Sequence, residues 1–95
     1  MTHFQKFTTE NCWGTVWTRP GLSRRDRSLL NLAMLSALGK PDELKLHVKG
    51  ALTNGLTRDE IAEVFLQVGV YCGVPACLES FKVGKAVFAE LDAKK

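Results

Sequence analysis

Apolar residues recur at helical spacing along most of this chain, and no segment shows the apolar–polar alternation that is typical of a strand. Thr57 and Glu60 form a capping box at the start of one apolar segment, and Gly39 stands where another should end. Pro75 occupies a position typical of the first turn of a helix. The pattern predicts an all-α fold, a compact bundle of four main helices. These helices should cover residues 24–38, 41–54, 57–72 and 75–91.

The N-terminal segment, residues 1–22, lacks this regularity. Its aromatic and apolar residues are spaced unevenly, so we expect a short helix or turn that packs on the core. Pro20 and Gly21 form a turn signal before the helical core, which should span 23–92. A chain of ninety-five residues makes one domain, so 1–95 is a single unit.

Two of the predicted helices, 24–38 and 75–91, are apolar on almost every side. A helix of this kind must be buried, and a chain of ninety-five residues is too short to cover two of them. We therefore expect a homo-oligomer in which part of this apolar surface lies between subunits.

Three polar residues, Glu63, Gln67 and Tyr71, follow one another at intervals of four along the predicted helix 57–72. This spacing places them on nearly one face of the helix. Their neighbours are apolar, so we expect this polar line to be largely buried, where a carboxylate, an amide and a phenol each need a partner. Such a line is either a structural hydrogen-bond network or one wall of a reactive pocket.

The formal net charge of +3 is mild, and we expect no nucleic-acid partner because a continuous basic face is missing. Arginine binds carboxylates with two hydrogen bonds, so the one arginine cluster suits a small anionic ligand. The N-terminal sequence has no long apolar run, so we expect no membrane partner and a soluble, cytoplasmic protein. The cluster consists of Arg19, Arg24, Arg25 and Arg27.

Two titratable residues are candidates for chemistry. His47 stands among apolar residues of the predicted helix 41–54, where a histidine is more often a core or interface residue than a catalyst. Imidazole is nevertheless the natural proton donor or acceptor near neutral pH. Glu63 could orient such an imidazole, or could act as an acid if burial raises its pKa. The structural alternative for Glu63 is an ion pair with Arg24, Arg25 or Arg58.

The spacing of the three cysteines does not indicate thiol chemistry. Cys72 and Cys77 have four residues between them, unlike the C-x-x-C of dithiol redox proteins, and no histidine follows Cys77. Two thiols and one distant histidine are too few ligands for zinc, so we expect no metal. The glycine-rich motifs of dinucleotide and ATP sites are absent from the sequence, so we expect no cofactor.

Two long segments, followed by a terminal helix, read WTRPGLSRRDRSLLNLAMLSALGK and ELKLHVKGALTNGLTRDEIAEVFLQVGVYCGVPA. In order and spacing they resemble the carboxymuconolactone decarboxylase family, from about Trp13 to Leu91. The likeness is closer to the decarboxylase branch than to the alkylhydroperoxidase-like branch, which is marked by a C-x-x-C and a trailing histidine. Members usually have a longer N-terminal helical region than the twelve residues that precede Trp13 here.

The resemblance implies an alkylhydroperoxidase-like helical fold that assembles as trimers or hexamers, with sites near subunit contacts. It implies cofactor-independent decarboxylation of 4-carboxymuconolactone, or a related lactone acid, to the 3-oxoadipate enol-lactone in protocatechuate degradation. In this carboxy-lyase reaction the unsaturated lactone can delocalise the electrons that carbon dioxide leaves behind. The protein must then hold carboxylates, stabilise an enolate and return a proton.

The resemblance also suggests roles for the candidate residues. His47, within the family-like ELKLHVKGALTNG segment, is the expected proton donor or enolate stabiliser, and Glu63 should orient or tune it from the opposite wall of one pocket. Arg24 or Arg25 should hold a substrate carboxylate. Further candidates for substrate binding are Gln67, Tyr71 and Trp17.

Two other functions remain open from the sequence. One is a thiol-dependent antioxidant protein of the alkylhydroperoxidase type, which would use Cys72 and Cys77. The other is a non-catalytic helical oligomer that binds an aromatic-pathway metabolite or a partner protein.

Overall fold

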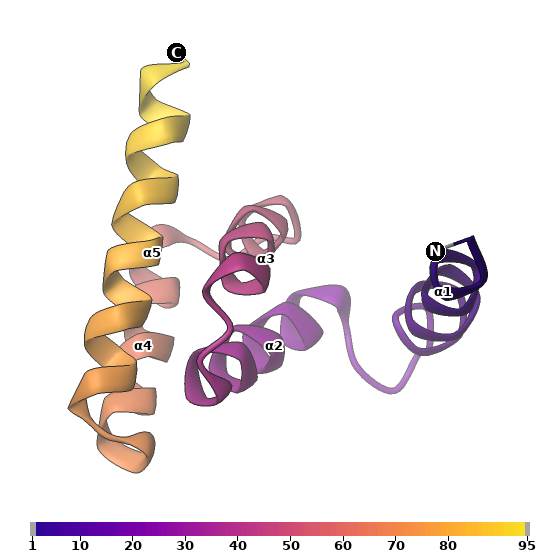
Figure 1. The fold of residues 1–95 in the computed structure, drawn as a ribbon, viewed down its shortest axis with the longest axis horizontal. Helices are drawn as coiled ribbons and strands as arrows, with labels where there is room; N and C mark the ends of the chain where they lie inside the picture. The colour runs from indigo at the N-terminus through magenta and orange to yellow at the C-terminus, as the bar shows by residue number, and fades with distance from the viewer. Residues whose placement is uncertain (1, 95) are drawn as a thin grey trace.

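The computed structural model describes residues 2–94, and these residues form helices without any strand (Figure 1). The four main helices expected from the sequence are all present, so the all-α prediction is confirmed. None of the helices in this range is long and apolar enough to cross a lipid bilayer. The four main helices are α2 (Arg24–Leu38), α3 (Pro41–Thr53), α4 (Arg58–Cys72) and α5 (Val74–Ala93). Two shorter elements precede them, the α-helix α1 (Thr2–Phe7) and the π-helix η1 (Thr8–Val16).

The helices begin and end where the local sequence signals predict. The Thr57 hydroxyl accepts a hydrogen bond from the backbone N–H of Glu60 at 3.1 Å, and the Glu60 carboxylate accepts one from the backbone N–H of Thr57 at 2.9 Å. Gly39 ends α2 in the left-handed conformation, with a φ of 68° that disfavours residues with a Cβ. These caps satisfy backbone groups that the helix ends would otherwise leave unpaired.

The hydrophobic core lies between the four main helices. Helix α4 packs on α5 and α2, and α3 packs on α2 and α5. Phe65 of α4 is 1% exposed and meets the ring of Phe81 of α5 edge-on, with ring centroids 5.5 Å apart. The other buried apolar residues are Leu32, Leu44, Val48, Ala51, Leu56, Ile61, Val64, Val68 and Val87.

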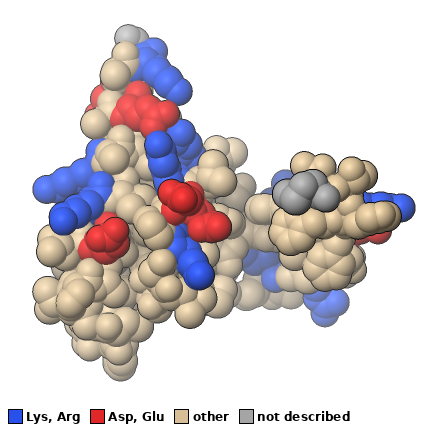
Figure 2. Space-filling model, viewed as in Figure 1, with Lys and Arg blue, Asp and Glu red and all other residues tan. Residues whose placement is uncertain are grey.

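Charged side chains join neighbouring helices on the surface of the bundle. Arg58 of α4 donates two hydrogen bonds to Asp92 of α5, of 2.7 and 3.1 Å, and its guanidinium lies 4.8 Å from the centre of the Phe88 ring. Glu90 of α5 accepts a hydrogen bond from Lys49 of α3 at 3.1 Å. Figure 2 shows basic and acidic side chains close together on one face of the bundle, whereas the end at which α4 meets α5 carries no charged side chain on that face.

Residues 2–16, which we call the N-terminal arm, stand apart from the bundle (Figure 1). No Cα atom of α1 or η1 lies within 8 Å of a Cα atom of α2 to α5. The expectation that this segment packs on the core is therefore wrong for its backbone. Side chains make the contact instead: the indole rings of Trp13 and Trp17 lie beside the imidazole of His47 on α3.

The linker between the arm and the bundle, residues 17–23, is held at both of its ends. The backbone N–H of Trp17 donates to the carbonyl of Cys12 at 3.0 Å, so the linker continues directly from η1. Arg27 of α2 donates to the carbonyl of Arg19 at 3.2 Å, which holds the linker to the start of α2. These two hydrogen bonds fix how the arm joins the bundle.

Replacing Gly84 of α5 by alanine should destabilise the bundle. A Cβ at this position would lie 3.1 Å from Cε2 of Phe65, and Phe65 is too tightly enclosed to move away. Overpacking of this kind costs about 1–3 kcal/mol, more than the gain of about 0.5–1 kcal/mol that alanine brings within a helix. Urea unfolding followed by circular dichroism should therefore show a lower midpoint.

Gly50→Ala provides the matched control, since a Cβ at that position of α3 would meet no atom within 4 Å. This variant should unfold at the same urea concentration as the wild type or at a higher one. Equal midpoints for Gly84→Ala and the wild type would contradict the tight contact with Phe65.

Candidate active site

Two hollows lie on different sides of α2, and they divide the candidate residues between them. One hollow is lined by Asn31 of α2, and the other by Leu29 and Ala33 of the same helix. Residues two positions apart in an α-helix point in nearly opposite directions. Helix α2 therefore forms a wall between the two hollows.

The larger hollow, which we call the α2–α4 groove, has a volume of about 580 Å³. Glu63, Gln67 and Tyr71 line it together, which confirms that they share one face of α4. Their expected burial is wrong for the single chain, in which all three are exposed and Tyr71 is 80% exposed. Helix α4 turns its buried apolar residues toward the core, and within residues 2–94 no helix covers the polar line. The apolar lining of the groove consists of Leu29, Ala33, Met34, Ala37, Val64 and Val68.

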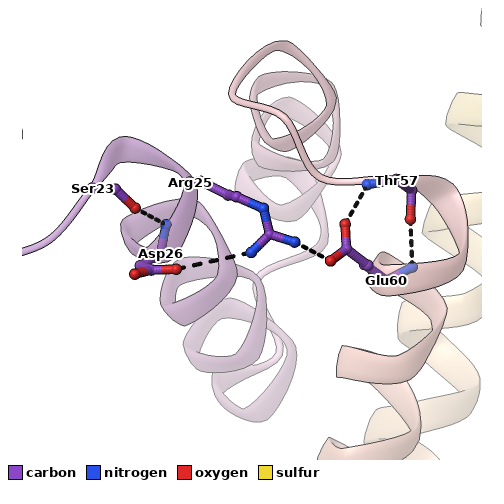
Figure 3. Close-up of polar contacts among 5 residues, drawn as sticks. All are labelled: Ser23, Arg25, Asp26, Thr57 and Glu60. Atoms are coloured by element: carbon purple, nitrogen blue, oxygen red, sulfur yellow. Dashed lines mark hydrogen bonds and ion pairs between the residues drawn. The ribbon is translucent and has the colours of Figure 1, made fainter.

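Arg25 binds the carboxylate of Glu60, one turn before Glu63 (Figure 3). The hydrogen bond with the backbone of Thr57 and, second to it, the guanidinium of Arg25 hold the pKa of Glu60 below its ordinary value. Arg58 is paired with α5, as described above. The arginine pairings considered for Glu63 are therefore not observed, and Glu63 makes no ion pair within residues 2–94.

The second hollow is built from aromatic side chains and has a volume of about 370 Å³. Trp13 and Trp17 stack with ring centroids 5.0 Å apart, and their centroids lie 6.2 and 6.4 Å from that of the His47 ring. The separation of four residues in the sequence brings the two indoles to one side of the arm and linker. Asn31 of α2 lines the same hollow.

Arg24, the first residue of α2, faces the same two indoles. It shares a neighbouring hollow of about 240 Å³ with Trp13, Trp17 and Asn54. The amide of Asn54 donates to the hydroxyl of buried Ser28 at 2.9 Å, which joins the end of α3 to the start of α2. Arg24 makes no ion pair with any described residue, so its guanidinium can receive an anion. We call the combined cluster the indole site, formed by Trp13, Trp17, Arg24, Asn31 and His47.

Burial lowers the pKa of His47 below its ordinary value, although the carboxylate of Glu43 one turn earlier raises it. The neutral imidazole, with one N–H donor and one acceptor nitrogen, is therefore the dominant form near neutral pH. The folded protein binds this proton less tightly than the unfolded chain does. Stability should thus rise with pH between the pKa of His47 in the folded protein and the ordinary value of about 6.5.

The structure brings some of the expected site residues together and separates others. His47, Trp17 and Arg24 meet at the indole site. The polar line of α4 lies in the α2–α4 groove, and Arg25 faces the beginning of α4. The expected pocket with His47 opposite Glu63 is not formed within one chain, because α2 stands between them.

Trp13 and Asn31 belong to the indole site, and Asn54 lines the hollow beside Arg24. None of these three residues was among the candidates from the sequence. Trp13 had a signal, since it precedes Trp17 by one helical turn. Asn31 also had one, because it interrupts an otherwise apolar segment. Asn54 is the last residue of the predicted helix 41–54, and nothing in its local sequence indicates that it lies beside Arg24.

The three cysteines are free thiols in different surroundings. Cys12 is exposed and lines the hollow beside His47, Cys72 is exposed in the α2–α4 groove, and Cys77 packs half-buried against Gly69. Within the described part of the chain, no three His, Cys, Asp or Glu side chains converge in a way that could hold a metal ion.

The sequence model of the carboxymuconolactone decarboxylase family matches residues 2–86, which include both hollows. This chain belongs to the carboxymuconolactone decarboxylase family. The match covers the N-terminal arm as well as most of the bundle, so Trp13 and His47 both lie inside the region that defines the family.

Three relatives show how this family member compares with longer proteins. It is 43% identical over 88 residues to 4-carboxymuconolactone decarboxylase of Acinetobacter baylyi, covering 93% of this chain and 66% of the relative. It is 49% identical over 79 residues to nitrosuccinic acid decarboxylase of Metarhizium robertsii, covering 83% and 55%. An uncharacterized 15.0 kDa protein of Paracoccus denitrificans is 34% identical over 86 residues, covering 87% and 63%. The chain thus spans less than two thirds of the length of each relative.

Trp13→Ala should raise the pKa of His47 in this family member toward its ordinary value, because the stacked indole keeps water away from the imidazole. Glu43→Gln should lower the pKa of His47 further, because it removes the carboxylate that raises it. NMR titration of the His47 ring protons can measure both shifts.

Gln5→Ala changes an exposed side chain of the same arm at a position outside the hollow, and it should leave the titration of His47 unchanged. Shifts of the same sign in the Trp13 and Glu43 variants would show that burial and the carboxylate do not act in the way described.

Proposed function

We propose that this chain catalyses cofactor-independent decarboxylation of 4-carboxymuconolactone, or of a related lactone acid, to the 3-oxoadipate enol-lactone in protocatechuate degradation. The observation that carries the proposal is the identity of 43%, over 93% of the chain, to a protein named as a 4-carboxymuconolactone decarboxylase. The second relative is named as a decarboxylase of nitrosuccinic acid, so it supports the reaction type rather than the particular substrate.

Decarboxylation breaks a carbon–carbon bond and leaves an electron pair on carbon. An unsaturated lactone can spread this pair to its carbonyl oxygen, and a nitro group can accept such a pair in the same way. The substrate therefore serves as its own electron sink. The tasks of the protein are to hold carboxylates, to stabilise the developing oxyanion and to return a proton.

The indole site offers a side chain for each of these tasks. Arg24 binds a substrate carboxylate with paired, charge-assisted hydrogen bonds. His47, in its neutral form, donates its N–H to the enolate oxygen, and the proton that returns to the substrate carbon passes through the imidazole. The indoles of Trp13 and Trp17 surround the departing carboxylate with a medium that is less polar than water.

The polar residues of α4 can act at the indole site only if that site belongs to another subunit. Glu63, with Gln67 and Tyr71 beside it, would act on the His47 of another chain, because α2 separates the two within one chain. Arg25 remains a candidate for a substrate carboxylate, although in the single chain it is engaged by Glu60.

Self-association as a trimer or hexamer, in an alkylhydroperoxidase-like arrangement, is part of the same proposal. Leu38, Val70 and Val74 are each about 70% exposed in the single chain. Apolar surface of this extent is typical of interfaces. The three free cysteines suit a reducing compartment, so we place the protein in the cytoplasm.

Incubation of the purified protein with 4-carboxymuconolactone tests the function. We expect release of carbon dioxide and formation of one enol-lactone for each molecule of substrate, without an added cofactor. Thermal stabilisation by the lactone with no product formed would instead indicate the non-catalytic binding protein. Peroxide-dependent turnover that is lost in Cys77→Ser would instead indicate the antioxidant protein.

Arg24→Gln should raise KM about 10–100-fold, because it removes a charge-assisted hydrogen bond worth about 1.5–3 kcal/mol. His47→Gln should lower kcat by a factor of about 10²–10⁴, the range that proton transfer by a positioned side chain contributes. Steady-state kinetics with the lactone can separate the two effects.

Arg19→Gln is the control for Arg24→Gln, since it removes the same charge from the arginine cluster at a position that lines neither hollow. The Arg19 variant should keep a KM close to that of the wild type. An equal rise of KM in both variants would mean that the cluster acts through its total charge and that Arg24 has no direct contact with substrate.

A further inference from the structure

The N-terminal arm carries apolar side chains that its own bundle leaves uncovered. Phe4 and Phe7 are 64% and 61% exposed, and their separation of three residues puts them on one face of α1. Val16 of η1 is also exposed. Aromatic side chains bring a large apolar area to a contact and often anchor interfaces. This face of the arm therefore suits a partner surface.

The α2–α4 groove is a matching surface on the bundle. Its floor is apolar, and Met34 and Tyr71 stand exposed on its walls. Val70 near the end of α4 and Val74 at the start of α5 are also exposed. The end of the bundle at which these two helices meet carries no charged side chain on the face drawn in Figure 2. A groove between two helices can accept a third helix through anchors that are three or four residues apart.

The arm of a chain cannot cover the groove of the same chain while Trp13 remains stacked on His47. The indole site and the groove lie on opposite sides of α2, and the hydrogen bond from Arg27 to Arg19 holds the linker to that helix. A second copy of the chain is not restricted in this way. Every copy offers both an arm and a groove. When the arm of each chain binds in the groove of the next, the chains form a head-to-tail assembly, which closes into a ring if the rotation from one chain to the next allows it.

We propose that the N-terminal arm of one chain binds in the α2–α4 groove of a second copy, with Phe4 and Phe7 as its anchors. The charges agree with this contact. Lys6 lies next to the anchors, and Glu63, which makes no ion pair within the described part of its own chain, lines the groove. This inference rests on the self-association proposed above, for which it specifies the contact, and does not depend on the decarboxylase activity.

Two double variants test the contact by native mass spectrometry and light scattering. Phe4→Ser/Phe7→Ser removes the anchors from the arm. Met34→Arg/Ala37→Arg fills the groove with charge at two positions that are exposed in the single chain, so the fold should tolerate it. Each variant alone should lose the wild-type oligomer and have the mass of one chain, with the helix content of the wild type by circular dichroism.

Matched controls place similar changes outside the proposed contact. Gln5→Ser changes the arm beside the anchors, and Leu46→Arg adds a charge at an exposed apolar position of α3. Both controls should keep the oligomer of the wild type.

An equimolar mixture of the two double variants gives the most specific result. Such a pair contains one intact groove, on the arm variant, and one intact arm, on the groove variant. The mixture should therefore form a 1:1 dimer and no larger species, although neither variant associates alone.

Three results would overturn the inference. An oligomer that persists in the arm variant alone would show that the chains meet without the arm, for example groove against groove. A mixture that stays monomeric would show that arm and groove do not bind each other. A wild-type protein that is monomeric at micromolar concentration would show that no second copy binds in the groove. If the mixture dimerises while the wild type releases no carbon dioxide from the lactone, the contact stands and the proposed function fails.

Discussion

The contact between Phe65 and Gly84 sets the arrangement of the helices around it. A Cβ on residue 84 would lie 3.1 Å from the Phe65 ring, so a glycine at this position lets α4 and α5 approach closely. With Phe65 and Ile61 turned toward the core, the rotation of α4 about its axis is determined. Glu63 then lies on the outer face beside α2, so the α2–α4 groove depends on the same contact that fills the core.

Helix α2 contacts the core, the indole site and the α2–α4 groove with different sides, which is one reason for its largely apolar sequence. Leu32 is fully buried in the core, Asn31 faces the indole site, and Ala33 and Ala37 line the groove. The two alanines keep the groove wide because they project little beyond the backbone. Part of the apolar sequence of α2 is therefore explained within one chain, whereas Leu30 and Leu38 remain exposed.

The helices and their boundaries could be predicted because their signals are local. The capping box of Thr57 and Glu60 and the αL position of Gly39 depend on residues within one turn. The shared face of the polar line also follows from its spacing alone. The burial of that line could not be predicted, because it depends on which helix lies over α4, and only the packing of distant segments decides this.

In the candidate site, too, the residues with local signals could be predicted, whereas their arrangement in space could not. His47 and Arg24 could be proposed from residue type and neighbours, and the structure places both beside Trp17. Their separation from Glu63 by α2 is a property of the tertiary fold. Asn54 shares a hollow with Arg24 although thirty residues separate them in the sequence, so no local pattern could have indicated it.

The way in which the helices pair has a consequence for the folding of the chain. Helix α2 packs on the next helix, α3, and α4 packs on the next helix, α5, whereas the N-terminal arm makes no backbone contact with any of them. Bundles built from neighbours in sequence fold quickly, on a scale of about microseconds to milliseconds. The bundle should therefore be complete before the arm binds a second copy in the proposed contact. In the proposed assembly, encounter between chains, and not the folding of any one of them, would then limit the rate at which the oligomer forms.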